Sequence, residues 1–238
     1  MLFRSPPAWI DREVPSCGGC GSTVRFRTIA RLVTRELLGS DAALCDVAGN
    51  RRVRGLGLSD ADVYARPLAR LFAYENTYLH ARPHLDILHI PDDRRGRYDF
   101  LIASDVFEHV APPIDVAFRN ARALLAAGGV FIFSAPFTLA DDTVEHFPEL
   151  HDWRLEKRDG RWRVVNRTRD GRLQAFDAPV FHGGPGTTLE MRLFSRAALI
   201  RHLIDAGFTK VRIADESCAS FGIAWPQPCS VPIVACAQ

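Results

Sequence analysis

Histidines and carboxylates are concentrated between residues 137 and 191, where Glu145, His146, His151 and Asp152 are followed by His182. An unperturbed imidazole titrates near physiological pH, so histidines beside carboxylates serve as general bases or as metal ligands. His146 and His151 are five positions apart, which is not the spacing of a zinc-binding pair on one helix. The alternative is that these side chains only stabilise the segment that contains them.

Two cysteines near the N-terminus, Cys17 and Cys20, have the spacing of half a zinc knuckle. A structural zinc site normally needs four ligands, and the chain has no second pair at this spacing. The remaining cysteines are scattered: Cys45, Cys218, Cys229 and Cys236. We therefore predict a turn that holds two thiols close together, and no metal site in the chain.

The elements that must position these groups are clearest in the middle of the chain. The apolar run 98–103 predicts a strand buried on both faces of a parallel sheet, and Asp105 follows its carboxyl end. Apolar residues then recur at helical spacing over 114–125. Gly128 and Gly129 are expected to end this helix, and residues 130–133 predict a second buried strand. Together they form a βαβ unit, whose crossover should be right-handed.

The sequence YDFLIASDVFEHV, followed by LLAAGGVFIFSAP, resembles the fourth strand, helix and fifth strand of class I S-adenosylmethionine-dependent methyltransferases. Members of that family often combine a strand that begins with an aspartate, a Glu-His-Val step and a Leu-x-x-Gly-Gly turn. The resemblance is specific over residues 97–136 and more diffuse over 53–213. A subgroup of the family also has a CxxCGSxxRxR segment before the catalytic fold, which matches Cys17, Cys20, Gly21, Ser22, Arg25 and Arg27.

This resemblance implies an α/β fold with a Rossmann-like, doubly wound and mostly parallel sheet and an antiparallel edge pair. Residues 1–42 would form an N-terminal CxxC segment and helix, the helix spanning 26–38 and ending at Gly39. Residues 43–238 would form the α/β domain, interrupted at 137–191 by a β-rich insertion after the fifth strand. Two strands at the end of the chain, 210–214 and 231–236, would make the edge pair.

The first core strand and its nucleotide loop are assigned to residues 53–59, followed by a helix over 62–72. Two other registers are weaker. A glycine loop at 19–22 would follow a strand broken by Pro15. A first strand at 43–48 would leave too few residues for a parallel crossover before 53–58.

By the resemblance, S-adenosylmethionine is the cofactor, and its contacts fall at the carboxyl ends of the strands. The implied cofactor-binding residues are Gly55, Gly57, Ser59, Asp60, Tyr78, Asp86, Ile87, Asp105 and Phe107. The strand over 75–79 lacks the acid that usually binds the ribose, and Glu75 or Asp60 would have to replace it. Asp86 would accept from the adenine amine, and the alternative is that it is only a loop cap.

The insertion is expected to line the acceptor pocket with residues 145–151 and 182–190. Within it, strands over 162–166 and 173–176 would be joined by a turn at Asp170-Gly171. His146 and His182 are the best candidates for a catalytic base, with His109 as a third.

The sequence HGGPG, which begins at His182, also resembles the oxyanion loop of α/β-hydrolases. That family needs a Gly-x-Ser-x-Gly nucleophile elbow downstream, and none follows here. These glycines are better explained as a tight loop packed against a ligand or a neighbouring strand.

Composition agrees with a compact enzyme. The 238 residues are 47% hydrophobic and 24% charged, and the formal net charge of +2 gives no reason to expect a nucleic acid or a membrane as partner. No apolar run approaches the length of a membrane span, which predicts a cytoplasmic protein. The predicted function is methyl transfer to a small-molecule or glycan-like acceptor. The alternative is a catalytically inactive methyltransferase fold that acts as a binding or scaffold protein.

Overall fold

A six-stranded sheet organises the protein, whose computed structural model describes residues 12–227 and 229–238. Part of the predicted N-terminal segment, residues 1–11, lies outside the described residues. In spatial order the strands are β13 (Phe208–Ile213), β14 (Ile233–Ala237), β4 (Leu125–Ser134), β3 (Tyr98–Ser104), β1 (Asn50–Leu58) and β2 (Phe72–Thr77). The last four run parallel, and β14 is antiparallel to both of its neighbours. The doubly wound, mostly parallel sheet with an antiparallel edge pair is thus confirmed.

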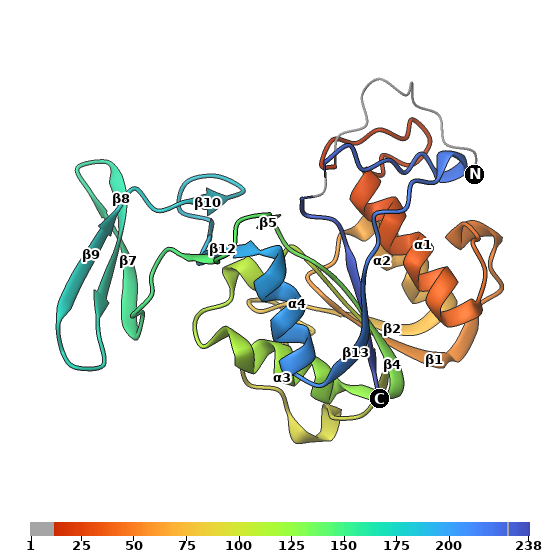
Figure 1. Ribbon diagram of the computed structural model, residues 1–238, viewed down its shortest axis with the longest axis horizontal. Helices are drawn as coiled ribbons and strands as arrows, with labels where there is room; N and C mark the ends of the chain where they lie inside the picture. The colour runs from red at the N-terminus through yellow and green to blue at the C-terminus, as the bar shows by residue number, and fades with distance from the viewer. Residues whose placement is uncertain (1–11, 228) are drawn as a thin grey trace.

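Helices cover both faces of the sheet (Figure 1). They are α1 (Val24–Leu38), α2 (Asp62–Leu71), α3 (Ile114–Leu124) and α4 (Arg196–Asp205). Short 3-10 turns connect them at η2 (Leu44–Asp46), η3 (Asp92–Arg94), η4 (Phe107–His109) and η5 (Ala219–Phe221). None of the helices in the described ranges is both long and apolar enough to cross a membrane.

Each face of the sheet has its own apolar core, because alternate residues of a strand point to opposite faces. Leu56, Leu101 and Phe131 pack with α3 and α4 on one face. Phe100 and Ile102 pack with α1 and α2 on the other. The sheet is therefore buried on both sides, as the continuous apolar run of β3 predicts.

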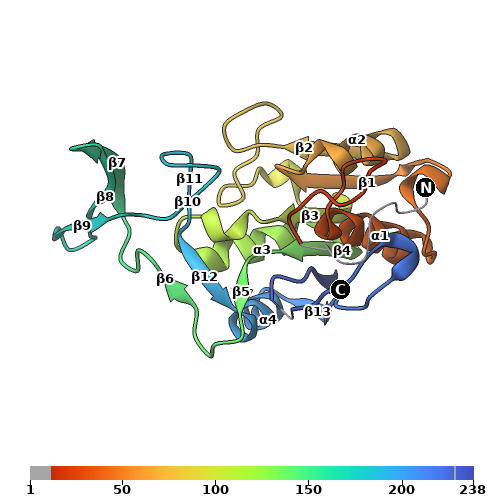
Figure 2. The ribbon, with the colours of Figure 1, turned by 90° about the horizontal axis from the view of Figure 1, so that it is seen from above.

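Between β4 and α4 the chain leaves the sheet domain to form a β-rich insertion. Its strands are β5 (Phe137–Thr138), β6 (Val144–Glu145), β7 (Asp152–Arg158), β8 (Arg161–Arg167), β9 (Leu173–Asp177), β10 (Phe181–His182), β11 (Thr188–Leu189) and β12 (Arg192–Ser195). Strands β7, β8 and β9 form an antiparallel sheet that projects from the body as an arm (Figure 1). The β10–β11 hairpin lies between this arm and the sheet domain (Figure 2). The predicted hairpin around Asp170-Gly171 is present as β8–β9.

Several element boundaries differ from the sequence prediction. Gly128 and Gly129 do not end α3, which stops at Leu124; they lie inside β4, where the register against β3 jumps from Leu125 to Val130. Strand β2 begins and ends earlier than the predicted 75–79. It ends at Thr77 because the N–H of the next residue, Tyr78, donates to the Pro83 carbonyl. The alternative first strand at 43–48 is excluded, since a 3-10 turn occupies 44–46.

Candidate functional site

Asp105 lies directly after β3, at the carboxyl end of the parallel strands, with a backbone φ of 55°. Its N–H donates to the carbonyl of Ser134 at 2.8 Å, and its Oδ1 accepts from Ser134 Oγ at 2.9 Å. Arg12 Nη2 donates to the same oxygen at 2.7 Å, and Arg25 Nε lies 3.4 Å from Oδ2. Burial alone would raise the pKa of Asp105, but the two guanidiniums outweigh it and lower the pKa. The carboxylate is therefore ionised and held between two arginines.

Arg25, in the first turn of α1, ties the N-terminal segment to the strand ends. Its side chain donates to both Glu13 oxygens, at 3.0 and 2.7 Å, and to Ser104 Oγ. Burial would lower the pKa of Arg25, but Asp105 and Glu13 raise it above the ordinary value. Arg25 belongs to the CxxCGSxxRxR pattern, so that segment contributes directly to the charge at the end of β3.

Asp60 follows β1 and is buried among polar groups of α2 and β2. Tyr64 Oη donates to its Oδ1 at 2.7 Å, and Tyr74 Oη donates to its Oδ2. Its N–H donates to Asn76 Oδ1 at 2.9 Å, and Asn76 Nδ2 donates back to its carbonyl at 2.8 Å. Burial raises the pKa of Asp60 to about 7, against the opposing effect of the two tyrosine hydroxyls. Both oxygens of this carboxyl are thus engaged inside the sheet domain.

The two glycines of β1 make room for neighbouring side chains of the protein itself. A Cβ at Gly55 would lie 2.0 Å from the Phe100 ring. A Cβ at Gly57 would lie 2.0 Å from Tyr74 Oη and 2.3 Å from Asp60 Oδ2. Packing in the face covered by α1 and α2 therefore explains why both positions are glycine.

Asp86 and Glu75 have protein partners already. Asp86 accepts from the Leu88 N–H at 2.9 Å, and its other oxygen lies 2.8 Å from His89 Nδ1, so it caps a turn. Glu75 pairs with Arg94 at 2.7 Å. Asp86 therefore caps a turn, as the alternative interpretation predicts, and Glu75 forms an ion pair at the surface.

The remaining predicted cofactor contacts divide between the core and the strand ends. Phe107 has no exposed surface and packs edge-on against Phe118, with centroids 4.9 Å apart, while Ile87 is 6% exposed in the same core. Tyr78 and Ser59 lie at the strand ends: Tyr78 Oη accepts from Asn76 at 3.0 Å, and Ser59 has a φ of 57° directly after β1.

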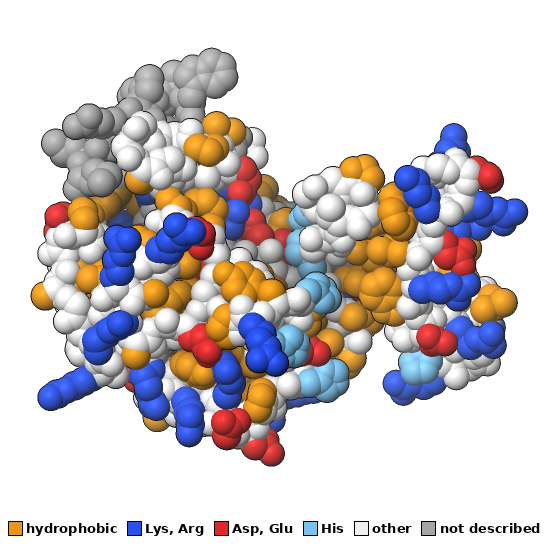
Figure 3. Space-filling model, turned by 180° about the vertical axis from the view of Figure 1, so that it is seen from behind, with side chains coloured by type: hydrophobic (Ala, Val, Ile, Leu, Met, Phe, Trp, Pro, Cys, Tyr) orange, Lys and Arg blue, Asp and Glu red, His pale blue; other side chains and the backbone are white. Residues whose placement is uncertain are grey.

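The three histidines proposed as bases, although distant in sequence, lie together beyond β3. His146 Nε2 is 2.8 Å from Glu190 Oε1, and His182 Nε2 is 2.6 Å from Glu190 Oε2. The rings of His109 and His182 meet edge to face, with centroids 4.6 Å apart. Figure 3 shows histidine side chains gathered where the sheet domain borders the hollow beside the arm. Glu190 joins His146 to His182, whereas the sequence predicts for it only a place in the lining of the acceptor pocket.

Arg192 holds the insertion against η4. Its side chain is fully buried, and Nη1 donates to the carbonyls of Phe107 (3.0 Å) and Val110 (2.6 Å). Its Nε donates to Glu145 Oε1 at 2.7 Å. Because these two carbonyls bracket Glu108 and His109, Arg192 fixes the turn that carries them. Nothing in the local sequence distinguishes this arginine from the exposed arginines elsewhere in the insertion.

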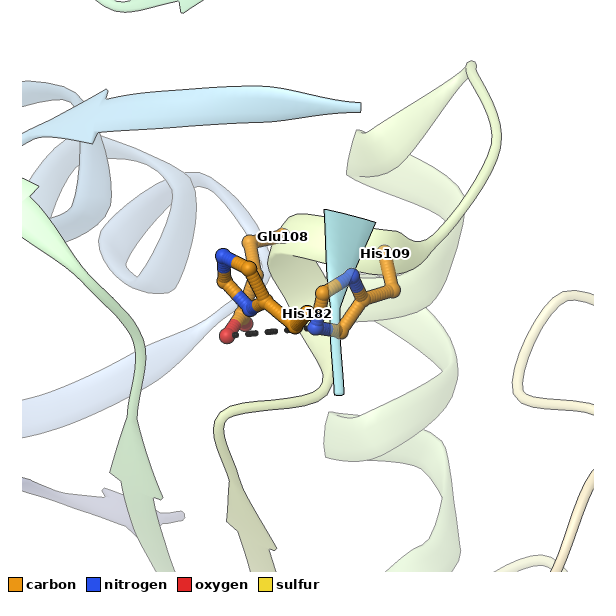
Figure 4. Close-up of side chains that lie close together, drawn as sticks. All are labelled: Glu108, His109 and His182. Atoms are coloured by element: carbon orange, nitrogen blue, oxygen red, sulfur yellow. Dashed lines mark ion pairs between the residues drawn. The ribbon is translucent and has the colours of Figure 1, made fainter. Parts of the chain in front are cut away.

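Glu108 is the second functional candidate that the sequence reading passed over. Its side chain is fully buried, and Oε1 lies 3.6 Å from His109 Nε2. Within the described ranges, 12–227 and 229–238, neither of its oxygens has a hydrogen-bond partner. Burial raises the pKa of Glu108 well above its ordinary value, and the Asp105 charge adds to the rise. Figure 4 shows Glu108, His109 and His182 converging on one point. The only sequence signal for Glu108 is the Glu-His-Val step, which by itself indicates the family and no chemical role.

Two other predicted features lie apart from this cluster. Cys17 and Cys20 stand in a turn closed by a 2.8 Å hydrogen bond from the Gly21 N–H to the Cys17 carbonyl. They line a cavity of about 390 Å³ with side chains of α1 and α2. The HGGPG loop packs on the arm, since a Cβ at Gly186 would lie 2.5 Å from the Trp162 ring.

One of the comparisons with known proteins shows a family. The sequence model of a family described as a methyltransferase domain matches residues 19–213. A search of curated protein sequences found no significant match.

Solved structures of low sequence identity share the fold. The CurJ carbon methyltransferase is 18% identical with a TM-score of 0.52; the match covers 89% of this chain and 54% of that one, so this chain spans about half its length. The sugar N-methyltransferase KedS8 from Streptoalloteichus sp. is 12% identical with a TM-score of 0.52, covering 100% and 99%. The amino pentose methyltransferase CalS10 from Micromonospora echinaspora is 15% identical with a TM-score of 0.50, covering 92% and 93%.

Proposed function

Since this chain belongs to the methyltransferase domain family, we propose that it transfers a methyl group from S-adenosylmethionine to a small-molecule acceptor. The observation that carries the proposal is the pairing of His146 and His182 with Glu190, next to the turn that follows Asp105. A methyltransferase with a weakly nucleophilic acceptor needs a cofactor site and a base side by side. The polar residues at the strand ends and the histidines paired with Glu190 support both parts of that requirement.

The residues at the strand ends fit S-adenosylmethionine in their chemistry. The amino-acid part of the cofactor is a zwitterion, and Asp105 and Arg25 offer a carboxylate and a guanidinium for its two charges. At the end of β2, Asn76 and Tyr78 offer an amide and a hydroxyl where the family usually has an acid for the ribose. Asp60 has both oxygens occupied by tyrosines, so we assign it to supporting this turn rather than to the ribose.

S-adenosylmethionine, when bound, supplies an electrophilic methyl group on its sulfonium. The chain must position the acceptor and accept the proton that the acceptor loses. Glu190 accepts from Nε2–H of both His146 and His182, which leaves Nδ1 of each ring with a free lone pair. A carboxylate that fixes the tautomer of an imidazole in this way prepares the opposite nitrogen as a base. Nδ1 of these rings is the proposed proton acceptor.

The acceptor class is also part of the proposal. The net charge of +2 does not favour a nucleic acid, and the half-buried histidines suit an acceptor with hydroxyl or amino groups. Of two structures of similar fold, one is named as an amino pentose methyltransferase and the other as a sugar N-methyltransferase. A hydroxylated or aminated small molecule of sugar-like character is therefore the first class to test.

Cofactor binding is tested by calorimetry with S-adenosylmethionine and with its demethylated product. We expect both to bind the full chain, and Asp105→Asn to weaken both by about tenfold or more, as for loss of a charged hydrogen bond. Absence of heat and of a thermal shift at millimolar ligand would instead support the inactive scaffold.

The base is tested with His146→Ala and His182→Ala, assayed for the demethylated cofactor product against a panel of amino sugars and phenols. Loss of a general base should lower turnover by about a hundredfold or more while leaving cofactor affinity nearly unchanged. His151→Ala is the matched control, since His151 is exposed and belongs to the same insertion. Full turnover in both variants would reduce the insertion to a lid and leave catalysis to orientation alone.

A further inference from the structure

Glu108, His109 and His182 place three possible ligand atoms within 4.8 Å of one another. The Glu108 side chain is fully buried, and neither of its oxygens has a hydrogen-bond partner in the part of the chain that the structure describes. Buried carboxylates are costly unless they are paired, hydrogen-bonded or bound to a metal. A buried carboxylate that faces two imidazoles, with no hydrogen bond and one long 3.6 Å contact to His109, is therefore an incomplete arrangement.

His109 and His182 each use one ring nitrogen in a hydrogen bond directed away from Glu108, which leaves a lone pair on the other ring nitrogen toward Glu108. His109 Nδ1 lies 2.9 Å from the Leu189 carbonyl, which can only accept, so Nδ1 carries the proton and Nε2 faces Glu108. His182 uses Nε2 toward Glu190, and its Nδ1 is left to face the cluster, as Figure 4 shows. Metal-binding histidines typically donate their other N–H to a carbonyl or a carboxylate in this way.

We propose that Glu108, His109 and His182 bind one divalent first-row transition cation, of the class of Zn²⁺ or Fe²⁺. Two imidazoles with one carboxylate suit these metals, whereas Mg²⁺ and Ca²⁺ prefer oxygen ligands. The site uses none of the cysteines, so it is distinct from the half knuckle at Cys17 and Cys20.

The spacing of one pair of the ligand atoms fits such a cation. Glu108 Oε1 and His109 Nε2 are 3.6 Å apart. Two ligands at about 2.0–2.2 Å from a metal and separated by this distance subtend about 120°, close to a tetrahedral or trigonal arrangement. His182 is 38% exposed, so the cluster is closed by Glu108 on one side and open on the other. Three protein ligands with an open position are typical of a catalytic rather than a structural metal site.

If the proposed methyl transfer holds, the cation has a defined use there. It lies between Asp105 and the insertion, where the acceptor would be held, and a Lewis acid lowers the pKa of a nearby hydroxyl. His182 is then a ligand, and His146 is left as the base that takes the proton of the acceptor. This role rests on the proposed function, but the binding of the metal does not.

The experiment uses the full chain, stripped with a chelator, equilibrated with Zn²⁺ alone and separated from excess metal. Elemental analysis should find one zinc per chain, and titration of Glu108→Gln and His182→Gln should show affinity at least tenfold lower. Glu190→Gln, which keeps all three ligands, should weaken zinc by about 10–100-fold through loss of orientation. His151→Gln and Cys17→Ser are the controls and should bind as the parent does.

Co²⁺ provides a second readout that does not depend on activity. The visible spectrum of Co²⁺ bound to the parent should differ from that of Co²⁺ with His182→Gln. The parent's spectrum should lack the near-ultraviolet charge-transfer band of a thiolate ligand. Circular dichroism of each variant confirms that it is folded. No zinc in the parent, zinc retained in both ligand variants, or zinc lost only in Cys17→Ser would each overturn the proposal. Cofactor calorimetry on the stripped protein tests the methyltransferase separately.

Discussion

The strongest single prediction concerns Arg192, which joins the insertion to the turn that carries Glu108 and His109. We expect Arg192→Met to destabilise the protein substantially, because the side chain is fully buried and holds Glu145 and two backbone carbonyls. Methionine can replace the packing of the aliphatic stem but none of these hydrogen bonds.

The size of the effect follows from what is left behind. Two buried carbonyls lose a charged donor, and Glu145 loses its ion-pair partner at 2.7 Å. Each hydrogen bond to a charged group contributes about 1.5–3 kcal/mol. Part of that is offset because the guanidinium no longer has to be desolvated, so the net loss should be about 3–5 kcal/mol, as for other broken buried pairs. A chain of this size would then melt about 6–20 °C lower.

Urea denaturation and thermal melting of the parent and of Arg192→Met measure this directly. Arg196→Met is the matched control, because Arg196 is exposed in the first turn of α4, and it should change stability by less than about 0.5 kcal/mol. If Arg192→Met lowered stability no more than the control does, the contacts of Arg192 would contribute nothing to stability, and another contact would have to hold η4 to the insertion.

Three further predictions test the sheet domain. Because the pKa of Asp60 is raised to about 7 by burial, the native state binds its proton more tightly than the unfolded chain; this stabilisation is full below about pH 4 and is lost as the pH rises to about 7. Urea denaturation across that range should show that the free energy of unfolding of the parent declines as the pH rises, and that the decline is smaller in Asp60→Asn; the same pH dependence in both would contradict the assignment. Gly55→Ala should lower the free energy of unfolding by about 1–3 kcal/mol through overpacking. When it is combined with Phe100→Leu, the total loss should be smaller than the sum of the two single losses, whereas additive losses would refute the contact. Ser195→Ala should cost about 1 kcal/mol, since its hydroxyl caps α4, and an unchanged urea midpoint would show the cap to be dispensable.

The local pattern of apolar and polar residues determined most of the sheet domain. The apolar run of β3, the helical spacing of α3 and the capping serine of α4 each encode their element within a few residues. Because these signals are local, they can be read without knowing what lies across the fold. The same pattern placed Asp105 at the end of β3, where the structure finds it.

Side-chain partners that are distant in the sequence were decided only by the tertiary structure. Gly55 is required by the Phe100 ring on the neighbouring strand, and no feature of β1 alone reports that ring. The histidines of the site could be named because their chemistry is unusual, but Glu190 became their common partner only once β10 and β11 had paired.

Burial was the other property that the sequence did not reveal. Glu108 and Arg192 are ordinary surface residue types, and both are fully buried because the insertion folds back over η4. A buried carboxylate and a buried guanidinium have properties that the same groups lack in water, because the low-dielectric interior strengthens every charge interaction and penalises every missing one. The sequence therefore determined which elements form and which side chains could do chemistry, whereas the tertiary structure decided which of them are desolvated together.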